Sequence, residues 1–251
     1  MSTMTSGRRH TPLRGCAVPH HCPRPVRLEV LSHARYLRGL DPSELAEVDA
    51  RMQVRGYDVD EPVFHAGDRA DTLYVLATGT VKLSRTTGDG RDVLIDVVAP
   101  GDLFGTLSAL GDPVYPDTAR ALTVACVLSI GADDFRVVMQ RHPSVALAVL
   151  DDLAHRLERN HQRVAHLSGG TVDQRVAAAL LRLVTVVGEP RDLGVLLQLP
   201  LTRADLASMS GTTTESASRV MSRLRQEGVV ESGRRWTSVL DVARLRALAQ
   251  T

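Results

Sequence analysis

Residues 201–230 read LTRADLASMSGTTTESASRVMSRLRQEGVV, and this stretch decides the fold of the C-terminal part of the chain. It predicts two short helices, 202–210 and 213–226, joined through Gly211. At about 100° per residue, the polar residues of the second helix share one face: Glu215, Ser218, Arg219 and Ser222. Its apolar residues share the opposite face: Ala217, Val220, Met221 and Leu224. One face is therefore expected to pack against a core and the other to remain exposed.

The polar face has the chemistry that reads base edges in the major groove of DNA. Arginine donates to guanine O6 and N7, glutamate accepts from the amino group of cytosine, and serine bonds to several edges. A hairpin expected over 229–239 carries Arg234, Arg235 and Trp236 and would serve as a wing that contacts phosphates. The sequence thus predicts a winged helix-turn-helix with these candidate DNA-binding residues: Thr202, Thr213, Thr214, Glu215, Ser218, Arg219, Ser222, Arg223, Arg234 and Arg235.

A purely local role for the same residues is the alternative interpretation. Glu215 would complete a capping box with Thr212, because the two have the S/T-x-x-E spacing. Arg219 would then only pair with Glu215 at i, i+4 on the helix surface.

A second periodic segment lies upstream, between residues 146 and 167. Its seam residues recur at steps of four and three: Ala146, Leu150, Leu153, Leu157, Asn160, Val164 and Leu167. This spacing predicts a coiled-coil helix, and the polar Asn160 is typical of a position that fixes the register of a two-stranded pair. We expect a parallel homodimer, with packing of this helix on its own chain as the alternative. Ser168-Gly169-Gly170 marks a domain boundary, after which 172–187 is expected to be a helix, 195–201 a strand and 241–249 the last helix.

Residues 57–130 consist of short β-rich runs separated by turn signals such as Gly88-Asp89-Gly90 and Pro100-Gly101-Asp102. Such spacing predicts a small antiparallel barrel or jelly roll, with 73–76, 80–84, 93–98 and 121–130 among its strands. Asp41-Pro42 marks the start of one short helix before the first strand. Residues 1–28 are rich in Pro, Arg, Ser, Thr and His and are expected to form a loosely ordered arm.

Composition narrows the functional classes. The chain has 251 residues, 43% hydrophobic content and a formal net charge of +1, which suits two modest domains. From Thr171 onward eleven Arg stand against eight Asp and Glu, a net charge of +3 that permits nucleic-acid binding. No apolar run approaches the roughly 18 residues that cross a bilayer, so we expect a cytoplasmic protein. Three scattered cysteines argue against a disulfide framework.

An enzyme is not expected, because the sequence lacks the common catalytic and nucleotide-binding fingerprints. A jelly-roll metal enzyme of the cupin type needs several histidine ligands, but His65 is the only histidine between Asp41 and Asp133. A dimeric ligand-binding barrel without DNA activity remains an alternative, although it leaves the polar face of 213–226 unexplained.

Over roughly residues 31–240 the chain resembles the CRP/FNR family, the cyclic-AMP receptor protein and its relatives. FHAGDRADTLYVLATGTVKL (64–83) resembles the barrel signature of the family, and 201–230 resembles its helix-turn-helix. The resemblance implies an α+β fold with an arm (1–28), a cyclic-nucleotide-binding-like β jelly roll (29–132), a helix pair with the dimerisation helix (133–168) and a winged helix-turn-helix (169–251). Glu215, Ser218 and Arg219 form an E-x-x-S-R pattern similar to the FNR branch, which implies TTGAT-like half-sites in inverted repeat. RNA polymerase is an expected partner.

The barrel departs from the cyclic-nucleotide-binding members of that family. Residues 101–121 read GDLFGTLSALGDPVYPDTARA, with Thr106 where those members have a glutamate for the ribose and Asp117-Thr118 where they have an Arg-Ser/Thr pair. A carboxylate at the phosphate position repels an anion. The sequence therefore disfavours cyclic AMP in the usual mode, while Arg120 leaves a shifted pose open.

The arm has its own candidate site, since Cys16, His20, His21 and Cys22 lie within seven residues. Such ligands suit zinc, iron or an iron-sulfur cluster. The arrangement resembles the cysteine-rich arm of FNR, which implies Cys126 as a further ligand, but a set of four cysteines is not present. The alternative is a solvated arm with Cys126 as a small core residue. The signal that the barrel or the arm senses stays unidentified.

Overall fold

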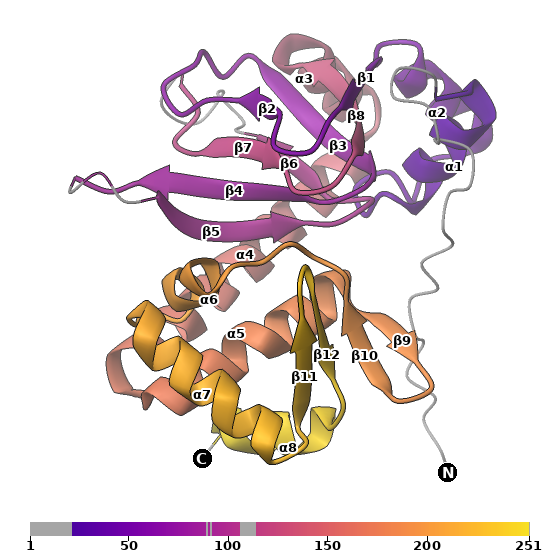
Figure 1. Cartoon of the computed structure of the whole chain (residues 1–251). Coiled ribbons are helices and arrows are strands. Elements are labelled where there is room, and N and C mark those ends of the chain that lie inside the picture. The colour runs from indigo at the N-terminus through magenta and orange to yellow at the C-terminus, as the bar shows by residue number, and fades with distance from the viewer. Residues whose placement is uncertain (1–21, 89, 91, 106–113, 251) are drawn as a thin grey trace.

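The computed structural model describes residues 22–88, 90, 92–105 and 114–250, and it shows two halves joined by one long helix (Figure 1). The N-terminal half begins with two helices, α1 (Arg24–His33) and α2 (Pro42–Asp49). The carboxylate of Asp41 accepts hydrogen bonds from the N–H groups of Ser43 and Glu44, and the Glu44 carboxylate accepts one from the Asp41 N–H. This capping box confirms the helix start predicted at Asp41-Pro42.

Eight strands follow and form two four-stranded antiparallel sheets. The first sheet has the order β1 (Gln53–Tyr57), β8 (Ala125–Gly131), β3 (Thr72–Thr78) and β6 (Leu103–Gly105). The second sheet has the order β2 (Pro62–Phe64), β7 (Thr118–Ala121), β4 (Val81–Thr86) and β5 (Asp92–Val98). The expected antiparallel jelly roll is confirmed.

Aromatic side chains fill the space between the two sheets. Phe64, Tyr74, Phe104 and Tyr115 contact one another there, with the Phe64 and Tyr115 ring centroids 3.9 Å apart. The outer face of the first sheet packs on α1, α2 and α3 (Ala132–Arg141) through another apolar cluster, because side chains alternate between the faces of a strand. Leu76 and Val127 thus face the barrel interior, whereas Leu128 faces the helices.

The long helix α4 (Pro143–Gly169) leads to the C-terminal half. There α5 (Val172–Val187) and α8 (Val242–Gln250) pack together, and a four-stranded sheet has the order β11 (Val230–Gly233), β12 (Trp236–Val239), β10 (Gly194–Leu197) and β9 (Glu189–Arg191). The remaining helices are α6 (Arg203–Met209) and α7 (Thr214–Gln226). No helix within the described ranges is long and apolar enough to span a bilayer.

The two halves share a hydrophobic core. Leu94 and Val97 on the outer face of β5 lie in the same cluster as Leu180 of α5 and Leu206 of α6. Figure 1 shows the β4–β5 hairpin directly above α6. The barrel therefore contacts the helix that precedes α7.

Several expected boundaries were wrong. Helix α1 begins at Arg24 and Cys22 is buried, so the loosely ordered arm does not extend to residue 28. The strand expected over 121–130 is divided by a turn into the end of β7 and β8, and the strand expected over 195–201 ends at Leu197. Strand β9 was not predicted. Short amphipathic helices and edge strands depend on tertiary packing, which local periodicity does not report.

Two glycines in the 64–83 segment, Gly67 and Gly79, lie in turns but differ in how much room a side chain would have. Gly67 and Gly79 both have positive φ, of 90° and 83°. A Cβ at Gly67 would meet nothing within 4 Å, but at Gly79 it would lie 2.4 Å from the Val124 carbonyl oxygen and 2.8 Å from the Ala125 Cα. Backbone atoms cannot rotate away as a flexible side chain can.

We expect Gly79→Ala to lower the free energy of unfolding by about 3 kcal/mol or more, because backbone must move in addition to the left-handed strain. Gly67→Ala should cost only about 1 kcal/mol, the strain alone. Urea denaturation followed by circular dichroism measures both. Equal losses would show that the contact with Val124 and Ala125 is not what requires Gly79.

Candidate nucleic-acid interface

Helix α7 presents one polar face to the surrounding solvent. Its buried residues are the four predicted ones: Ala217, Val220, Met221 and Leu224. Glu215, Arg219 and Ser222 are exposed, and Ser218 is half-buried. The predicted division of this helix into a packed face and an exposed face is confirmed.

The capping box expected between Thr212 and Glu215 is not formed. Helix α7 is capped by Thr213, not Thr212, and the Thr213 hydroxyl accepts a hydrogen bond from the Ser216 N–H at 3.2 Å. Hydrogen bonds to its own N–H and to Thr213, together with the Arg219 charge, lower the pKa of Glu215, so this side chain is an ionised acceptor at neutral pH. No ion pair within 4 Å engages Arg219 in the part of the chain that the structure describes.

The turn before α7 is held from two sides. Thr202 and Asp205 form a reciprocal capping box at the start of α6, with donor–acceptor distances of 2.8 and 3.0 Å. Gly211 has a φ of 57°, and a Cβ there would lie only 2.7 Å from Cδ2 of Leu167 near the end of α4. The end of the long helix is thus in contact with the helix-turn-helix.

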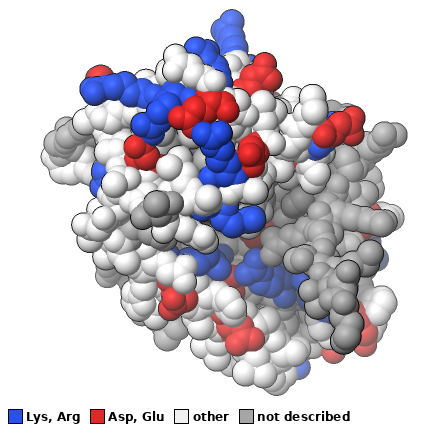
Figure 2. All heavy atoms as spheres, turned by 90° about the horizontal axis from the view of Figure 1, so that it is seen from below, with Lys and Arg blue, Asp and Glu red and all other residues white. Residues whose placement is uncertain are grey.

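The other predicted DNA-binding residues lie in different settings. Thr214 is exposed in the first turn of α7. Arg234 and Arg235 are exposed in the turn between β11 and β12, where Arg235 has a φ of 70°. Arg223 instead forms ion pairs with Asp173 of α5 and Glu227. Seen from below, basic side chains form a band across the molecule, with acidic ones beside them (Figure 2).

Helix α4 has two separate stripes of side chains. Val145, Val149 and Asp152 are buried against the N-terminal half. The predicted seam lies on another side and is exposed, with exposed fractions of 60% for Leu150, 57% for Leu157 and 62% for Val164. The packing of α4 on its own chain therefore leaves the middle of the seam exposed, from Leu150 to Val164, while Leu167 at its end contacts the turn at Gly211.

A buried polar cluster joins α4 to the barrel. The Asp152 carboxylate accepts hydrogen bonds from Tyr36 Oη at 2.6 Å, Arg35 Nη1 at 2.8 Å and Arg156 Nε at 2.5 Å. Arg156 also donates to the Leu103 carbonyl oxygen at 2.9 Å. These donors lower the pKa of Asp152 against the opposing effect of burial, so the carboxylate stays ionised. This cluster was not predicted, because Tyr36 and Asp152 are far apart in the chain and are brought together only by the fold.

The stretch that corresponds to a cyclic-nucleotide phosphate site is only partly described. Thr106 lies outside the described residues. The Asp117 carboxylate pairs with Arg85 at 2.8 Å. Ala119 and Ala121 face the barrel interior, so Arg120 between them lies on the outer face, where its Nη1 donates to the Asp60 carbonyl oxygen. Arg120 therefore points away from the barrel interior.

Two of the candidate metal ligands belong to the same apolar cluster. Cys22, which precedes α1, and Cys126 of β8 are both buried in one apolar cluster, and both interact electrostatically with Arg27. Cys16, His20 and His21 lie outside the described residues. Within the described ranges, no group of three or more His, Cys, Asp or Glu residues is placed to hold a metal ion.

Comparisons with known proteins match both halves. Residues 54–142 match the family described as "Cyclic nucleotide-binding domain", and residues 174–248 match the "Crp-like helix-turn-helix domain". The cyclic AMP receptor protein of Thermus thermophilus is 33% identical over 211 residues, which cover 84% of this chain and 94% of that protein. A CRP-like cAMP-activated global transcriptional regulator of Mycobacterium tuberculosis is 27% identical over 222 residues, 88% of this chain and 99% of that protein.

Solved structures of similar regulators also match this chain. FixK2 from Bradyrhizobium japonicum matches with a TM-score of 0.69 at 25% identity, over 78% of this chain and 96% of that one. A CRP-family transcriptional regulator from Thermus thermophilus matches with a TM-score of 0.64 at 29% identity, over 78% of this chain and 97% of that one.

Proposed function

Because the chain belongs to the CRP/FNR family of DNA-binding transcription regulators, we propose that it binds an inverted-repeat operator as a homodimer and reads that operator with α7. The observation that carries this proposal is the exposed polar face of α7, on which Glu215 is ionised and Arg219 has no ion-pair partner among the described residues. The E-x-x-S-R pattern supports TTGAT-like half-sites.

The exposed seam of α4 supports the homodimer. Leucines as exposed as Leu150 and Leu157, repeated along one line of a helix, favour a second helix of the same kind as the partner. In such a parallel pair the two α7 helices would be related by a two-fold axis and would enter successive major grooves roughly 34 Å apart.

The signal would act through the contacts of α4. Asp152 and Arg156 join α4 to Tyr36 and to Leu103 of β6, and Leu167 contacts the turn at Gly211. A ligand or modification that shifts the N-terminal half could thereby change the population of DNA-competent dimers. We further propose that the protein acts in the cytoplasm, with RNA polymerase as a partner and without catalysing a reaction.

We do not propose cyclic AMP as the ligand inside the barrel. Asp117 replaces the expected arginine, and its pairing with Arg85 reduces but does not reverse its charge. Arg120 points to the outer face and does not supply the missing cation inside the barrel.

A metal-dependent signal is the second candidate, and the burial of Cys22 and Cys126 in one apolar cluster near Arg27 favours it. These two thiols and the arm residues Cys16, His20 and His21 would hold zinc, iron or an iron-sulfur cluster. The nearby Arg27 guanidinium would stabilise the thiolate forms.

We expect Arg219→Ala to weaken binding to a TTGAT inverted repeat by about 1 to 3 kcal/mol and to leave binding to random DNA nearly unchanged, since only base contacts are lost. Arg234→Ala is the matched control, because the loss of a phosphate contact should weaken binding to both DNAs alike and lower the slope of the salt dependence by about 0.9 per protomer. Fluorescence anisotropy titrations measure both. An equal loss on random DNA would remove Arg219 from base reading.

Leu157→Glu should convert the dimer to a monomer. The dimer loses one buried leucine from each protomer, about 3 kcal/mol apiece and about 6 kcal/mol in all, which raises its dissociation constant roughly 10,000-fold. His155→Glu places the same charge off the seam and should leave the dimer intact, as measured by sedimentation equilibrium. A wild-type protein that is monomeric at every concentration would contradict the proposed assembly.

For the metal candidate, protein purified without oxygen should contain stoichiometric iron or zinc, and Cys126→Ser should lose it. Elemental analysis, an acid-labile sulfide assay and the visible spectrum give the readouts. A colourless, metal-free dimer with unimpaired operator binding would eliminate this candidate.

A further inference from the structure

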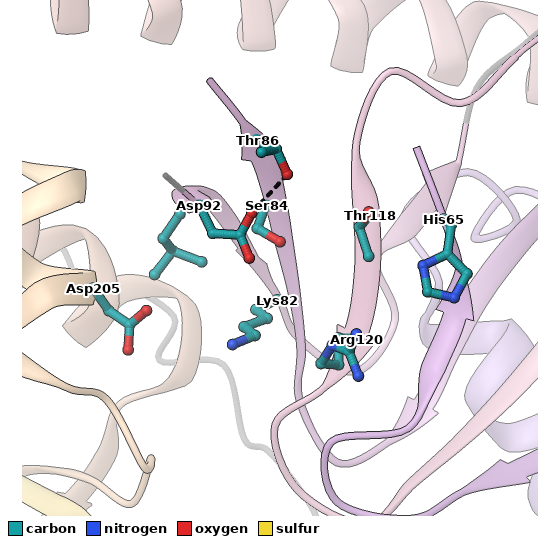
Figure 3. A pocket seen from close by; sticks show the side chains of 9 residues that line it. His65, Lys82, Ser84, Thr86, Asp92, Thr118, Arg120 and Asp205 are labelled. Carbon is teal, nitrogen blue, oxygen red and sulfur yellow. Dashed lines mark hydrogen bonds between the residues drawn. The ribbon is translucent and has the colours of Figure 1, made fainter. Parts of the chain in front are cut away.

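A polar pocket lies where the second sheet of the barrel meets α6. It has a volume of about 250 Å³ and is lined by side chains of β4, β5 and β7, by His65 after β2, and by Asp205 of α6 (Figure 3). Because Ala119 and Val81 face the barrel interior, their neighbours Arg120 and Lys82 open to the opposite side of the sheet. This pocket is therefore separate from the space between the two sheets.

Lys82 occupies the middle of the pocket (Figure 3). The sequence contains 29 arginines and a single lysine, which is Lys82. Each of the four barrel arginines that the structure describes pairs with a carboxylate, whereas Lys82 has no ion-pair partner within 4 Å among the described residues. The N–H donors of its ammonium group are thus available to an acceptor in the pocket.

The carboxylates of the pocket are already hydrogen-bonded. Asp92 accepts from Thr86 Oγ1 at 2.7 Å, and Asp205 accepts from the N–H and the hydroxyl of Thr202 at 2.8 and 2.7 Å. The cations differ, because Lys82 has no ion-pair partner among the described residues. Arg120 donates to the Asp60 carbonyl oxygen and lies 3.7 Å from the Asp60 carboxylate, and its guanidinium group still has further donors. The end of the pocket near Lys82 and Arg120 therefore has cationic hydrogen-bond donors available for an anion.

We propose that this pocket binds a small ligand that carries one oxyanion, a phosphate or a carboxylate, together with a hydroxyl or amino group. Lys82 and Arg120 would hold the oxyanion, and the hydroxyls of Ser84 and Thr118 lie beside them to donate further hydrogen bonds. The hydroxyl or amino group would face Asp205, which would repel a second anionic group. A volume of about 250 Å³ corresponds to roughly eight waters, so the ligand is a small metabolite.

The position of the pocket couples it to the helix-turn-helix. Asp205 lies in the first turn of α6, the helix that leads into the turn at Gly211 and into α7. Leu94, which also lines the pocket, belongs to the core shared by the two halves. A ligand in contact with both β4 and α6 would favour one placement of α6 relative to the barrel. This coupling, though not the site itself, rests on the proposed DNA-binding function.

The single lysine allows a direct test by amine acetylation. Peptide mass spectrometry would follow the acetylation rate of Lys82, with the α-amino group as the internal control. The matched probes are glycerol 3-phosphate and glycerate, with glycerol and chloride at equal ionic strength as blanks. At ten times its dissociation constant, a bound probe should slow acetylation of Lys82 about tenfold.

Protection by glycerol 3-phosphate alone identifies a phosphate site, and protection by glycerate alone identifies a carboxylate site. No protection by either, or equal slowing by chloride, would overturn the proposal. Lys82→Gln should abolish the rise in unfolding temperature that the protective probe produces, whereas Arg69→Gln, on an exposed side chain outside the pocket, should retain it. A rise that persists in Lys82→Gln would also overturn the site.

Operator titrations with and without the protective probe test the coupling. We expect at least about a fivefold change in the affinity of the wild type for DNA and none for Lys82→Gln. Protection of Lys82 with unchanged DNA affinity would overturn the coupling and leave the site in place. Protection of Lys82 in a protein that binds no DNA would instead refute the proposed function.

Discussion

The carboxylate of Asp152 is buried, and a buried charge is tolerated only when partners surround it. Tyr36, Arg35 and Arg156 supply those partners, and together they fix the rotation of α4 about its own axis. With that rotation set, Val145 and Val149 face the N-terminal half and Leu150 and Leu157 face outward. The same helix reaches the helix-turn-helix at Gly211, so one buried carboxylate orients both the exposed seam and the contact with the DNA-reading half.

The two faces of the second sheet of the barrel pack against different hydrophobic clusters. Its inner face packs against the aromatic cluster, while Leu94 and Val97 on its outer face enter the core of the C-terminal half. The polar residues of the outer face, Lys82 and Arg120 among them, line the edge of that contact. The contact between the two halves is thus apolar at its centre and has a charged pocket at its edge. A small ligand in that pocket can change how the two halves pack, since few contacts must be lost for them to shift.

Much of the C-terminal half could be predicted from local pattern. The helix over 172–187 was placed at its observed bounds, and the faces of α7 followed from residue spacing, because side chains three and four apart on a helix share a face. Helix α1 was missed because the prolines and arginines around it resemble a disordered arm, and its stability comes from packing of Val30 and Leu31. The role of Arg223 could not be foreseen either, since its partner Asp173 is 50 residues away.

The sequence by itself determined the family, the helix-turn-helix and the polar face of α7, because these depend on periodicity and on motifs within a few turns of chain. Only the tertiary structure decided that Arg120 faces outward, that Cys22 lies in one cluster with Cys126, and that Lys82 shares a pocket with Asp205. These neighbours are far apart in the chain and are brought together by the closing of the barrel and its packing on α6. Such long-range contacts follow from the whole core rather than from any local pattern.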